Sequence, residues 1–303
     1  MRTISLLIPL VSVSLGTTDR LVDPELVEAF ARDGFVVVPD LLTADEVARY
    51  DELVTAAVHE RTKDDDVPFE QKSRYQQSFI QCMNLWEDHP EVRPLTFHPK
   101  LAQAAAELLQ VDAIRVWHDQ ALYKQPGGRP TDAHQDHPYW PMKETSSVTA
   151  WIPLQGSTLE SGALGYLPGT HAIGLRRFVN IFFGEPRDIL SDPEVQGIEP
   201  VFLEVPAGSV AYHHGLTVHL ANPNTTDRHR AVHTIIYFPD GHTRGYPHPH
   251  FAVDRAGIEV GQKIASDVTP IAWPRPDGSL PEPPPGDLML RPGITNPGAA
   301  PAR

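Results

Sequence analysis

Short apolar segments rich in β-branched and aromatic residues dominate the chain from residue 113 onward. They occupy residues 113–117, 120–124, 147–154, 163–167, 200–204, 209–220 and 231–238. Turn-forming stretches such as Pro126-Gly127-Gly128 and Pro206-Ala207-Gly208 separate them. Many short strands divided by glycine and proline turns are typical of a double-sheet jelly roll. The sequence therefore predicts a mostly β fold with a double-stranded β-helix (jelly-roll) core.

The N-terminal part of the chain predicts helices that flank this core. Gly34 is a helix stop signal after an amphipathic segment, and Thr43 with Glu46 has the spacing of a capping box, which opens a helix. We expect helices at residues 24–33, from 44 to about 61 and at about 99–109, with a strand at 35–40. These helices would cover the outside of the barrel.

The tripeptide His134-Gln135-Asp136 is a candidate metal site. In an extended segment, residues two apart point to the same face, so an imidazole nitrogen and a carboxylate oxygen can approach one ion. A third ligand from a distant strand, for which we choose His219, would complete one face of an octahedron. Two histidines and one carboxylate in this arrangement are the ligand set of non-haem Fe(II) oxygenases.

A turn-rich segment connects His219 to Arg230. Asn, Pro, Thr and Asp residues at 222–229 lie between the apolar runs 209–221 and 232–238, which predicts a hairpin with a longer loop. A turn centred between residues 224 and 225 would place His219 and Arg230 opposite each other on one sheet face, with Cβ atoms roughly 5 Å apart. A guanidinium beside a metal suits a chelating dicarboxylic acid, because it pairs with a carboxylate through two hydrogen bonds.

These residues resemble the phytanoyl-CoA dioxygenase family of Fe(II)- and 2-oxoglutarate-dependent oxygenases. The family pattern is His-x-Asp, a distal His, and an Arg eleven residues beyond it, which is the separation of His219 and Arg230 here. The similarity extends over roughly residues 23 to 245. Further matching pieces are Lys124-Gln125-Pro126-Gly127, Tyr139-Trp140, Ala150-Trp151, the run 162–171, and Asn224-x-Thr226-Asp227-x-x-Arg230.

The resemblance implies an activity and a set of cofactors. It implies Fe(II), 2-oxoglutarate as cosubstrate and O2, with hydroxylation of a C–H bond of a small organic substrate and release of succinate and CO2. It assigns the metal ligands to His134, Asp136 and His219. It further implies that Arg230 binds the carboxylate of 2-oxoglutarate and that Trp151 packs against this cosubstrate.

Two residues refine this expectation. Halogenating relatives lack the carboxylate ligand, so the presence of Asp136 favours hydroxylation. Family members often have a serine two residues after the distal histidine, where its hydroxyl helps to hold 2-oxoglutarate. This chain has Ala221 at that position, so the hydrogen bond must come from elsewhere or be absent.

Two other function classes stay open. One is a jelly-roll metal-binding enzyme that does not use 2-oxoglutarate, and it would have no reason to place Arg230 near His219. The other is a non-catalytic binding module, which should tolerate loss of the metal ligands. His213 is the one rival ligand, because strand alternation puts it on the face of His219 and puts His214 on the other face.

The remaining histidines have less specific interpretations. We expect His171 to take part in a turn and His137 to line the mouth of a substrate site. His242, His248 and His250 belong to the Gly/Pro-rich segment 241–249 or follow it directly. This pattern predicts a solvated loop, with a substrate-contacting loop as the alternative.

Composition limits the partners. The net charge is −14, whereas nucleic acid or an anionic membrane would require a basic patch. We therefore expect a small-molecule substrate, with neither of those partners, and the oligomeric state is not determined by the sequence. The acidity also cautions against assuming a CoA ester as the substrate, because its phosphates need local cations. The candidates for that task are Arg176, Arg177, Arg244 and Lys263.

A single cysteine, Cys82, excludes an intramolecular disulfide and multi-cysteine zinc sites, which predicts a reducing, cytoplasmic compartment. Residues 1–20 form an expected N-terminal extension, whose apolar run is too short to span a bilayer. Residues 21–273 are expected to be one oxygenase domain. Its insertion at 172–198 and the 60–90 region are expected to close over substrate. Residues 274–303 predict a Pro-rich surface tail.

Overall fold

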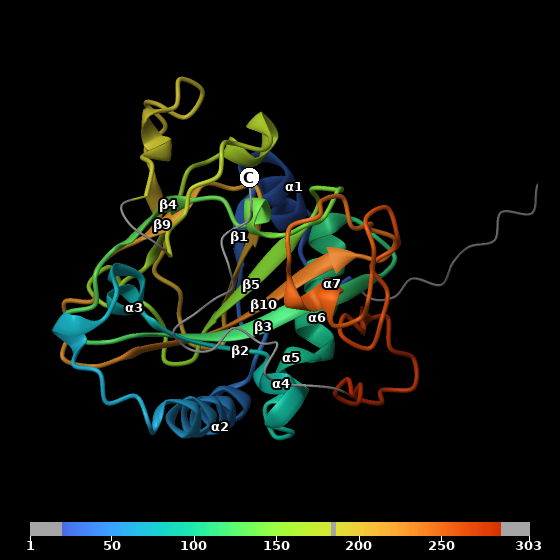
Figure 1. Cartoon of the computed structure of the whole chain (residues 1–303), viewed down its shortest axis with the longest axis horizontal. Helices are drawn as coiled ribbons and strands as arrows, with labels where there is room; N and C mark the ends of the chain where they lie inside the picture. The colour runs from blue at the N-terminus through green and yellow to red at the C-terminus, as the bar shows by residue number, and fades with distance from the viewer. Residues whose placement is uncertain (1–19, 183–185, 286–303) are drawn as a thin grey trace, which may run out of the picture.

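The computed structural model describes residues 20–182 and 186–285, and it contains two antiparallel sheets (Figure 1). The larger sheet has the order β1 (Phe35–Val38), β8 (Val210–His214), β5 (Val148–Pro153), β10 (Arg230–Pro239), β3 (Ile114–Lys124) and β11 (Ile271–Trp273), and β2 (Ile80–Met83) also pairs with β3. The smaller sheet has the order β4 (Thr131–His134), β9 (His219–Ala221), β6 (Leu164–Tyr166) and β7 (Val201–Phe202). The predicted mostly β fold with a jelly-roll core is confirmed.

Helices cover one face of the larger sheet. Residues from α1 (Pro24–Asp33), α2 (Ala44–Thr62) and α6 (Pro99–Leu109) share one buried cluster with alternate residues of β5, β8 and β10. Leu101 is fully buried there, and its backbone carbonyl accepts a hydrogen bond from the Tyr212 hydroxyl at 3.0 Å. The flanking helices were predicted. The short helices α3 (Arg74–Ser78), α4 (Leu85–Asp88), α5 (Arg93–Thr96) and α7 (Phe251–Asp254) were not.

The ends of the first two helices form as the sequence predicts. Helix α1 stops at Gly34, whose φ of 84° is a left-handed conformation that suits glycine. At the start of α2, the Thr43 hydroxyl accepts from the backbone N–H of Glu46, and the Glu46 carboxylate accepts from the backbone N–H of Thr43 at 2.8 Å. This capping box therefore satisfies backbone donors at both positions.

The other face of the larger sheet looks toward the smaller sheet. Along β10, Ala231 and Ile235 belong to the cluster under the helices, whereas Val232 belongs to a cluster with Trp151 and Tyr166. This alternation is the period of two that a strand requires. It means that Arg230, Val232 and Thr234 point into the space between the two sheets.

The predicted hairpin between His219 and Arg230 is wrong. Residues 209–220 form two strands in different sheets, and β9 pairs with β4 and β6 while β10 pairs with β3 and β5. The Asn224 amide donates to the carbonyls of Lys124 and Arg228, at 2.9 Å and 2.7 Å. The turn is thus fixed against the end of β3, and the connection carries the chain from one sheet to the other.

The insertion at 172–198 is mainly irregular in its described residues, with short 3₁₀ turns at Thr170–Ile173 and Ile189–Ser191. Val179 and Ile181 lie in one buried cluster with Tyr75 and Phe79. The rings of Phe182 and Tyr75 are 4.4 Å apart. The insertion therefore packs directly on the α3 region.

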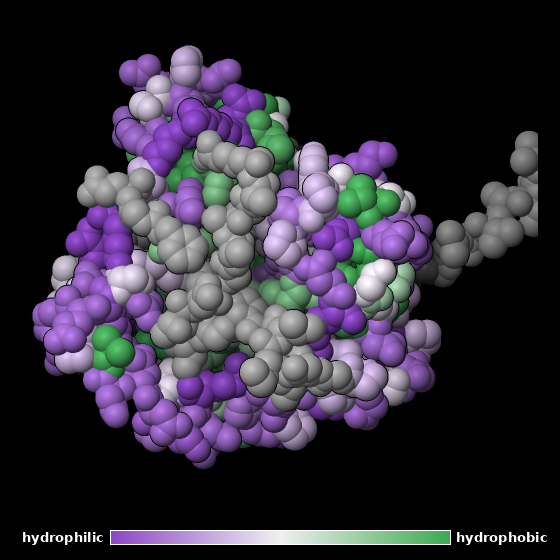
Figure 2. All heavy atoms as spheres, viewed as in Figure 1, coloured by the Kyte–Doolittle hydropathy of each residue, from purple (hydrophilic) through white to green (hydrophobic). Residues whose placement is uncertain are grey.

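The chain ends fall largely outside the described residues. Of the predicted extension at 1–20, the structure describes Arg20 alone, and of the tail at 274–303 it describes 274–285, which contains no helix or strand. Within the described ranges, no helix combines the length and the apolar character needed to cross a membrane. The face in Figure 2 is mainly hydrophilic.

Candidate metal centre

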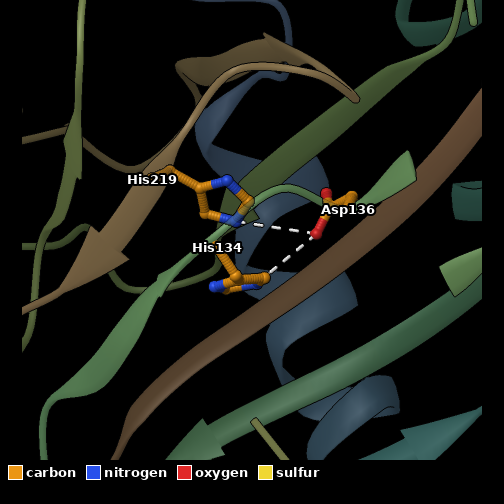
Figure 3. A group of neighbouring side chains, drawn as sticks. All are labelled: His134, Asp136 and His219. Carbon is orange, nitrogen blue, oxygen red and sulfur yellow. Dashed lines mark ion pairs between the residues drawn. The ribbon is translucent and has the colours of Figure 1, made fainter. Parts of the chain in front are cut away.

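Three of the predicted site residues meet between the sheets. His134 and His219 are direct cross-strand partners of β4 and β9, and Figure 3 shows their rings and the Asp136 carboxylate pointing toward one another. Each Nε2 atom lies 3.6 Å from Oδ1 of Asp136. One ligand atom from each residue falls within 4.8 Å of the others.

Asp136 reaches this position by a different route from the one predicted. Strand β4 ends at His134, and Asp136 has helical dihedrals, φ −76° and ψ −42°, at the start of a 3₁₀ turn over His137–Tyr139. The alternation of an extended segment therefore does not explain its orientation. The turn after β4 brings the carboxylate back toward the two imidazoles.

Backbone carbonyls fix the orientation of both imidazoles. Nδ1 of His134 is 2.8 Å from the carbonyl of Asp132, and Nδ1 of His219 is 3.1 Å from the carbonyl of Thr217. A carbonyl can only accept, so both Nδ1 atoms carry the hydrogen and donate. The lone pair of each neutral ring is then on Nε2, which is the arrangement typical of metal-binding histidines.

The ionisation states also suit a cation. Burial lowers the pKa of His219 to about 3, so this imidazole is neutral at pH 7. Burial alone would raise the pKa of Asp136, but the surrounding imidazoles lower it well below its usual range. The cluster thus offers Nε2 of two imidazoles and one anionic oxygen, which fit a divalent iron ion with open positions for further ligands.

The second oxygen of Asp136 accepts hydrogen bonds from two residues of the larger sheet. Oδ2 accepts from the Thr149 hydroxyl at 3.2 Å and from Nε2 of His213 at 3.1 Å. His213, the rival ligand, therefore lies on the expected face of its strand but contacts the far oxygen of Asp136. Among the described residues, the group able to hold a metal contains His134, Asp136 and His219 without His213.

Arg230 is a buried cation in the same interior. It is 4% exposed, and its Cζ lies 5.3 Å from the centre of the Trp151 ring. Nη1 donates to the carbonyl of Gly162 at 2.6 Å, and Nε has no partner. No carboxylate pairs with it in the described part of the chain. Burial lowers the pKa of Arg230 to about 10, so the guanidinium stays charged at pH 7.

Lys124 belongs to one of the family motifs, and the sequence predicts no role for it. It is the cross-strand partner of Arg230 and has no exposed surface. Its Nζ donates to the carbonyl of Arg129 and, at 3.4 Å, to the Thr131 hydroxyl. Burial and the neighbouring charge of Arg230 lower its pKa to about 6. The sequence does contain a signal for this residue. Lys124 ends an apolar strand, and a lysine is rarely buried without a partner, so its position indicates a functional contact.

Ala221 is buried in the cluster that contains Trp151 and Tyr166. Its cross-strand neighbour in β4 is Thr131, whose hydroxyl contacts Lys124. The chain therefore places a hydroxyl on the strand beside Ala221, although position 221 itself has none.

The other histidines lie mostly inside the protein. His137 is 2% exposed, and its ring lies 5.9 Å from that of Trp140. It is therefore buried and does not lie at a surface opening. The prediction of a solvated loop at 241–249 is wrong for His242 and Arg244, which are both buried. His171 is in a turn as predicted, with Nε2 3.2 Å from the carbonyl of Ala31.

The suggested phosphate-binding cations are engaged elsewhere or lie at the surface. Arg244 donates to the carbonyl of Ile258 at 2.7 Å and pairs with Asp254. Arg176 pairs with Glu194, Lys263 pairs with Asp240, and Arg177 is exposed. The described residues therefore give no support to a CoA ester.

A jelly roll that encloses two imidazoles, one carboxylate and a buried arginine has the architecture of the iron- and 2-oxoglutarate-dependent oxygenases. A family model described as phytanoyl-CoA dioxygenase (PhyH) matches residues 30–232. The chain belongs to this family, as the sequence motifs indicated.

Individual relatives agree with this assignment. The chain is 30% identical over 157 residues to a phytanoyl-CoA dioxygenase of Arabidopsis thaliana, covering 50% of this chain and 53% of that protein. It thus spans about half the length of the curated relatives it matches.

Among solved structures, the non-heme alpha ketoglutarate dependent carbocyclase SnoK from nogalamycin biosynthesis superposes with a TM-score of 0.69 and 26% identity. The match covers 82% of this chain and 96% of SnoK. The epimerase SnoN, solved in complex with Fe3+, alpha ketoglutarate and nogalamycin RO, shares the fold with a TM-score of 0.67 at 24% identity. This second match covers 82% of this chain and 97% of SnoN.

Proposed function

We propose that this protein is an Fe(II)- and 2-oxoglutarate-dependent dioxygenase that hydroxylates a C–H bond of a small organic substrate and releases succinate and CO2. His134, Asp136 and His219 hold the iron. Arg230 binds the far carboxylate of 2-oxoglutarate, and Trp151 packs against it. The observation that carries the proposal is the buried guanidinium of Arg230, which faces the same interior as the His-Asp-His cluster and has no carboxylate partner among the described residues.

The buried charge of Arg230 is costly. Buried charges are normally paired, so a buried cation without a carboxylate partner favours a bound anion. Tyr166 connects the two parts of the site: its ring lies 6.2 Å from His219, and it affects the pKa of Arg230. A short dicarboxylic acid that reaches from the metal cluster to Arg230 would neutralise this charge.

Lys124 and Thr131 supply the contact that Ala221 cannot make. Lys124 lies beside Arg230, and Thr131 lies beside Ala221. A carboxylate between these side chains would receive hydrogen bonds from the Lys124 ammonium and the Thr131 hydroxyl. It would also raise the pKa of Lys124, which would then bind a proton.

When iron and 2-oxoglutarate are bound, they supply the oxidant that is made from O2. The residues of the chain fix the metal, orient the cosubstrate and exclude water. The insertion 172–198 and the α3 region would cover the substrate, because Tyr139, Phe182 and Tyr75 form adjacent ring contacts near His134. These aromatic walls favour an uncharged or ring-bearing portion of the substrate.

Succinate formation tests the proposal. Anaerobically purified protein with Fe(II) should convert 2-oxoglutarate to succinate when O2 is added, slowly alone and faster with a substrate from a metabolite library. Asp136→Asn should lower this rate by more than about 100-fold, because it removes the anionic ligand. Asp132→Asn is the matched control, since that side chain pairs with Arg74.

The two alternative classes give different results. Metal binding without affinity for 2-oxoglutarate in calorimetry would indicate a metal protein that does not use this cosubstrate. Protein that binds neither would be a non-catalytic module.

A further inference from the structure

Two buried side chains, Tyr166 and His213, approach the metal cluster without belonging to it. Nε2 of His213 lies 3.1 Å from Oδ2 of Asp136, and its Nδ1 lies 3.3 Å from the Tyr166 hydroxyl. His213 is on β8 of the larger sheet, Tyr166 is on β6 of the smaller sheet, and neither is more than 2% exposed. A continuous chain of hydrogen bonds therefore runs from Tyr166 through His213 to Asp136.

The hydrogens in this chain have a defined direction. An ionised carboxylate can only accept, so a neutral His213 ring must carry its hydrogen on Nε2. Nδ1 is then an acceptor, and the Tyr166 hydroxyl donates to it. Burial raises the pKa of Tyr166, which keeps this hydroxyl protonated. Stacking on Phe35, with ring centroids 4.7 Å apart, holds the phenol ring in place.

This direction decides what His213 can do. A histidine ligates a metal through a nitrogen lone pair, and here Nε2 has none to offer while Tyr166 donates to Nδ1. The ring is close enough to matter, because its centroid is 4.5 Å from that of His219. Without the tyrosine hydroxyl, the lone pair on Nδ1 would lose its donor, and a turn of the ring could present that lone pair to the ion.

We infer that Tyr166 and His213 form a positioning relay for Asp136. The Tyr166 hydroxyl donates to Nδ1 of His213 and holds the ring in place, and Nε2 of His213 holds Oδ2 of Asp136. The carboxylate therefore faces the metal with Oδ1 alone, and His213 stays out of the ligand set. The relay rests on the proposed function, since it keeps positions on the metal open for 2-oxoglutarate and O2.

The test compares Tyr166→Phe, His213→Leu and the double variant. Two quantities are measured: the dissociation constant for Co(II) by absorption titration, and the visible charge-transfer absorption of anaerobic protein with saturating Fe(II) and 2-oxoglutarate. His213→Leu should weaken Co(II) binding by about tenfold or more, as loss of an outer partner does. Tyr166→Phe should retain Co(II) affinity yet reduce the charge-transfer absorption, because the released His213 takes a position that 2-oxoglutarate needs.

The double variant separates a relay from a general disturbance. If Tyr166 acts through His213, Tyr166→Phe should cause no further loss of charge-transfer absorption in the His213→Leu background, so the effects of the two changes on this absorption are non-additive. Two independent structural roles would give additive effects, and that result would overturn the inference.

Conservative and neighbouring variants complete the experiment. His213→Gln keeps an N–H donor near the position of Nε2 and should restore Co(II) affinity toward that of the wild type. His214→Gln is the matched control on the same strand, because His214 faces away and accepts from the backbone N–H of Leu216 at 3.1 Å. Thermal unfolding of the metal-free proteins checks that each variant is folded.

The outcomes distinguish the two proposals. Wild-type protein that binds Co(II) but gives no absorption with 2-oxoglutarate would contradict the proposed oxygenase, while the Co(II) affinities would still decide whether His213 positions Asp136. Co(II) affinity that is unchanged in His213→Leu, together with absorption that is unchanged in Tyr166→Phe, would refute the relay and leave the oxygenase proposal intact. Wild-type protein without Co(II) affinity would overturn both.

Discussion

At the scale of single residues, the site depends on buried charges that the fold itself does not neutralise. Arg230 and Lys124 are cross-strand partners, and both are buried. In the free protein, burial and then the charge of Arg230 disfavour the protonated form of Lys124 and lower its pKa. Under the proposed function, this cost in stability accompanies a site that binds the carboxylate of 2-oxoglutarate.

Lys124→Met should affect stability and cosubstrate binding in opposite directions. A lysine whose folded pKa is near 6, against 10.5 in the unfolded chain, lowers stability progressively as pH falls from 10.5 toward 6. The variant should thus raise the free energy of unfolding at pH 7 by about 1–4 kcal/mol in metal-free protein. It should also raise the KM for 2-oxoglutarate by roughly tenfold or more, since a charged hydrogen bond is lost.

Urea unfolding and succinate assays measure the two effects. Lys100→Met on the exposed side of α6 is the control. A less stable Lys124→Met protein with an unchanged KM would contradict this account of Lys124.

At the scale of elements, local signals predicted the helices well and the strand pairing poorly. Gly34 and the Thr43 capping box are short-range features, so the sequence contains all the information they require. The pairing of β9 and β10 depends on which distant strands compete for each edge. Residues 222–229 have the composition of a hairpin turn in either case, and nothing in them distinguishes a hairpin from a crossing between sheets.

The same limit applies to the candidate site. The spacing of its residues predicted that His134, Asp136 and His219 would come together, although Asp136 arrives through a turn. The sequence offered Lys124 and Tyr166 only as parts of motifs and His213 only as a rival ligand, because their contacts are with partners on other strands.

Thr43→Ala measures how much one such local signal contributes. Removing the hydroxyl leaves the backbone N–H of Glu46 without its partner, so the free energy of unfolding should fall by about 1 kcal/mol. Thr62→Ala at the other end of α2 is the matched control, because its hydroxyl bonds back to the Val58 carbonyl inside the helix. Urea denaturation provides the comparison, and equal losses for the two variants would argue against a capping role.

At the scale of the whole molecule, many histidines are enclosed as neutral rings. Burial is the main cause that lowers the pKa of His118 to about 4 and the pKa values of His214 and His233 to about 3. Such rings are uncharged in the folded protein at pH 5, whereas the unfolded chain would protonate them. The fold is therefore expected to be acid-sensitive.

Acid should destabilise the folded protein. Because these folded pKa values lie below the ordinary value of 6.5, the stability is fully present above pH 6.5 and is lost as pH falls toward 3 to 4. Metal-free protein should lose several kcal/mol between pH 7 and pH 5, at about 1.4 kcal/mol per pKa unit for each ring.

Urea titrations at the two pH values test this dependence. His233→Gln should make it shallower, while His59→Gln, a change at an exposed position, should leave it unaltered. A wild-type protein equally stable at both pH values would show that these rings accept protons without unfolding.

The two oxygens of Asp136 contact residues of different sheets. Its Oδ2 is tied to Thr149 and His213 of one sheet, while its Oδ1 faces His134 and His219 of the other. A cation bound among these groups would connect the two sheets, in addition to the apolar side chains and hydrogen bonds that already join them. Binding of the ion would then stabilise the packing of the two sheets as well as complete the proposed active site.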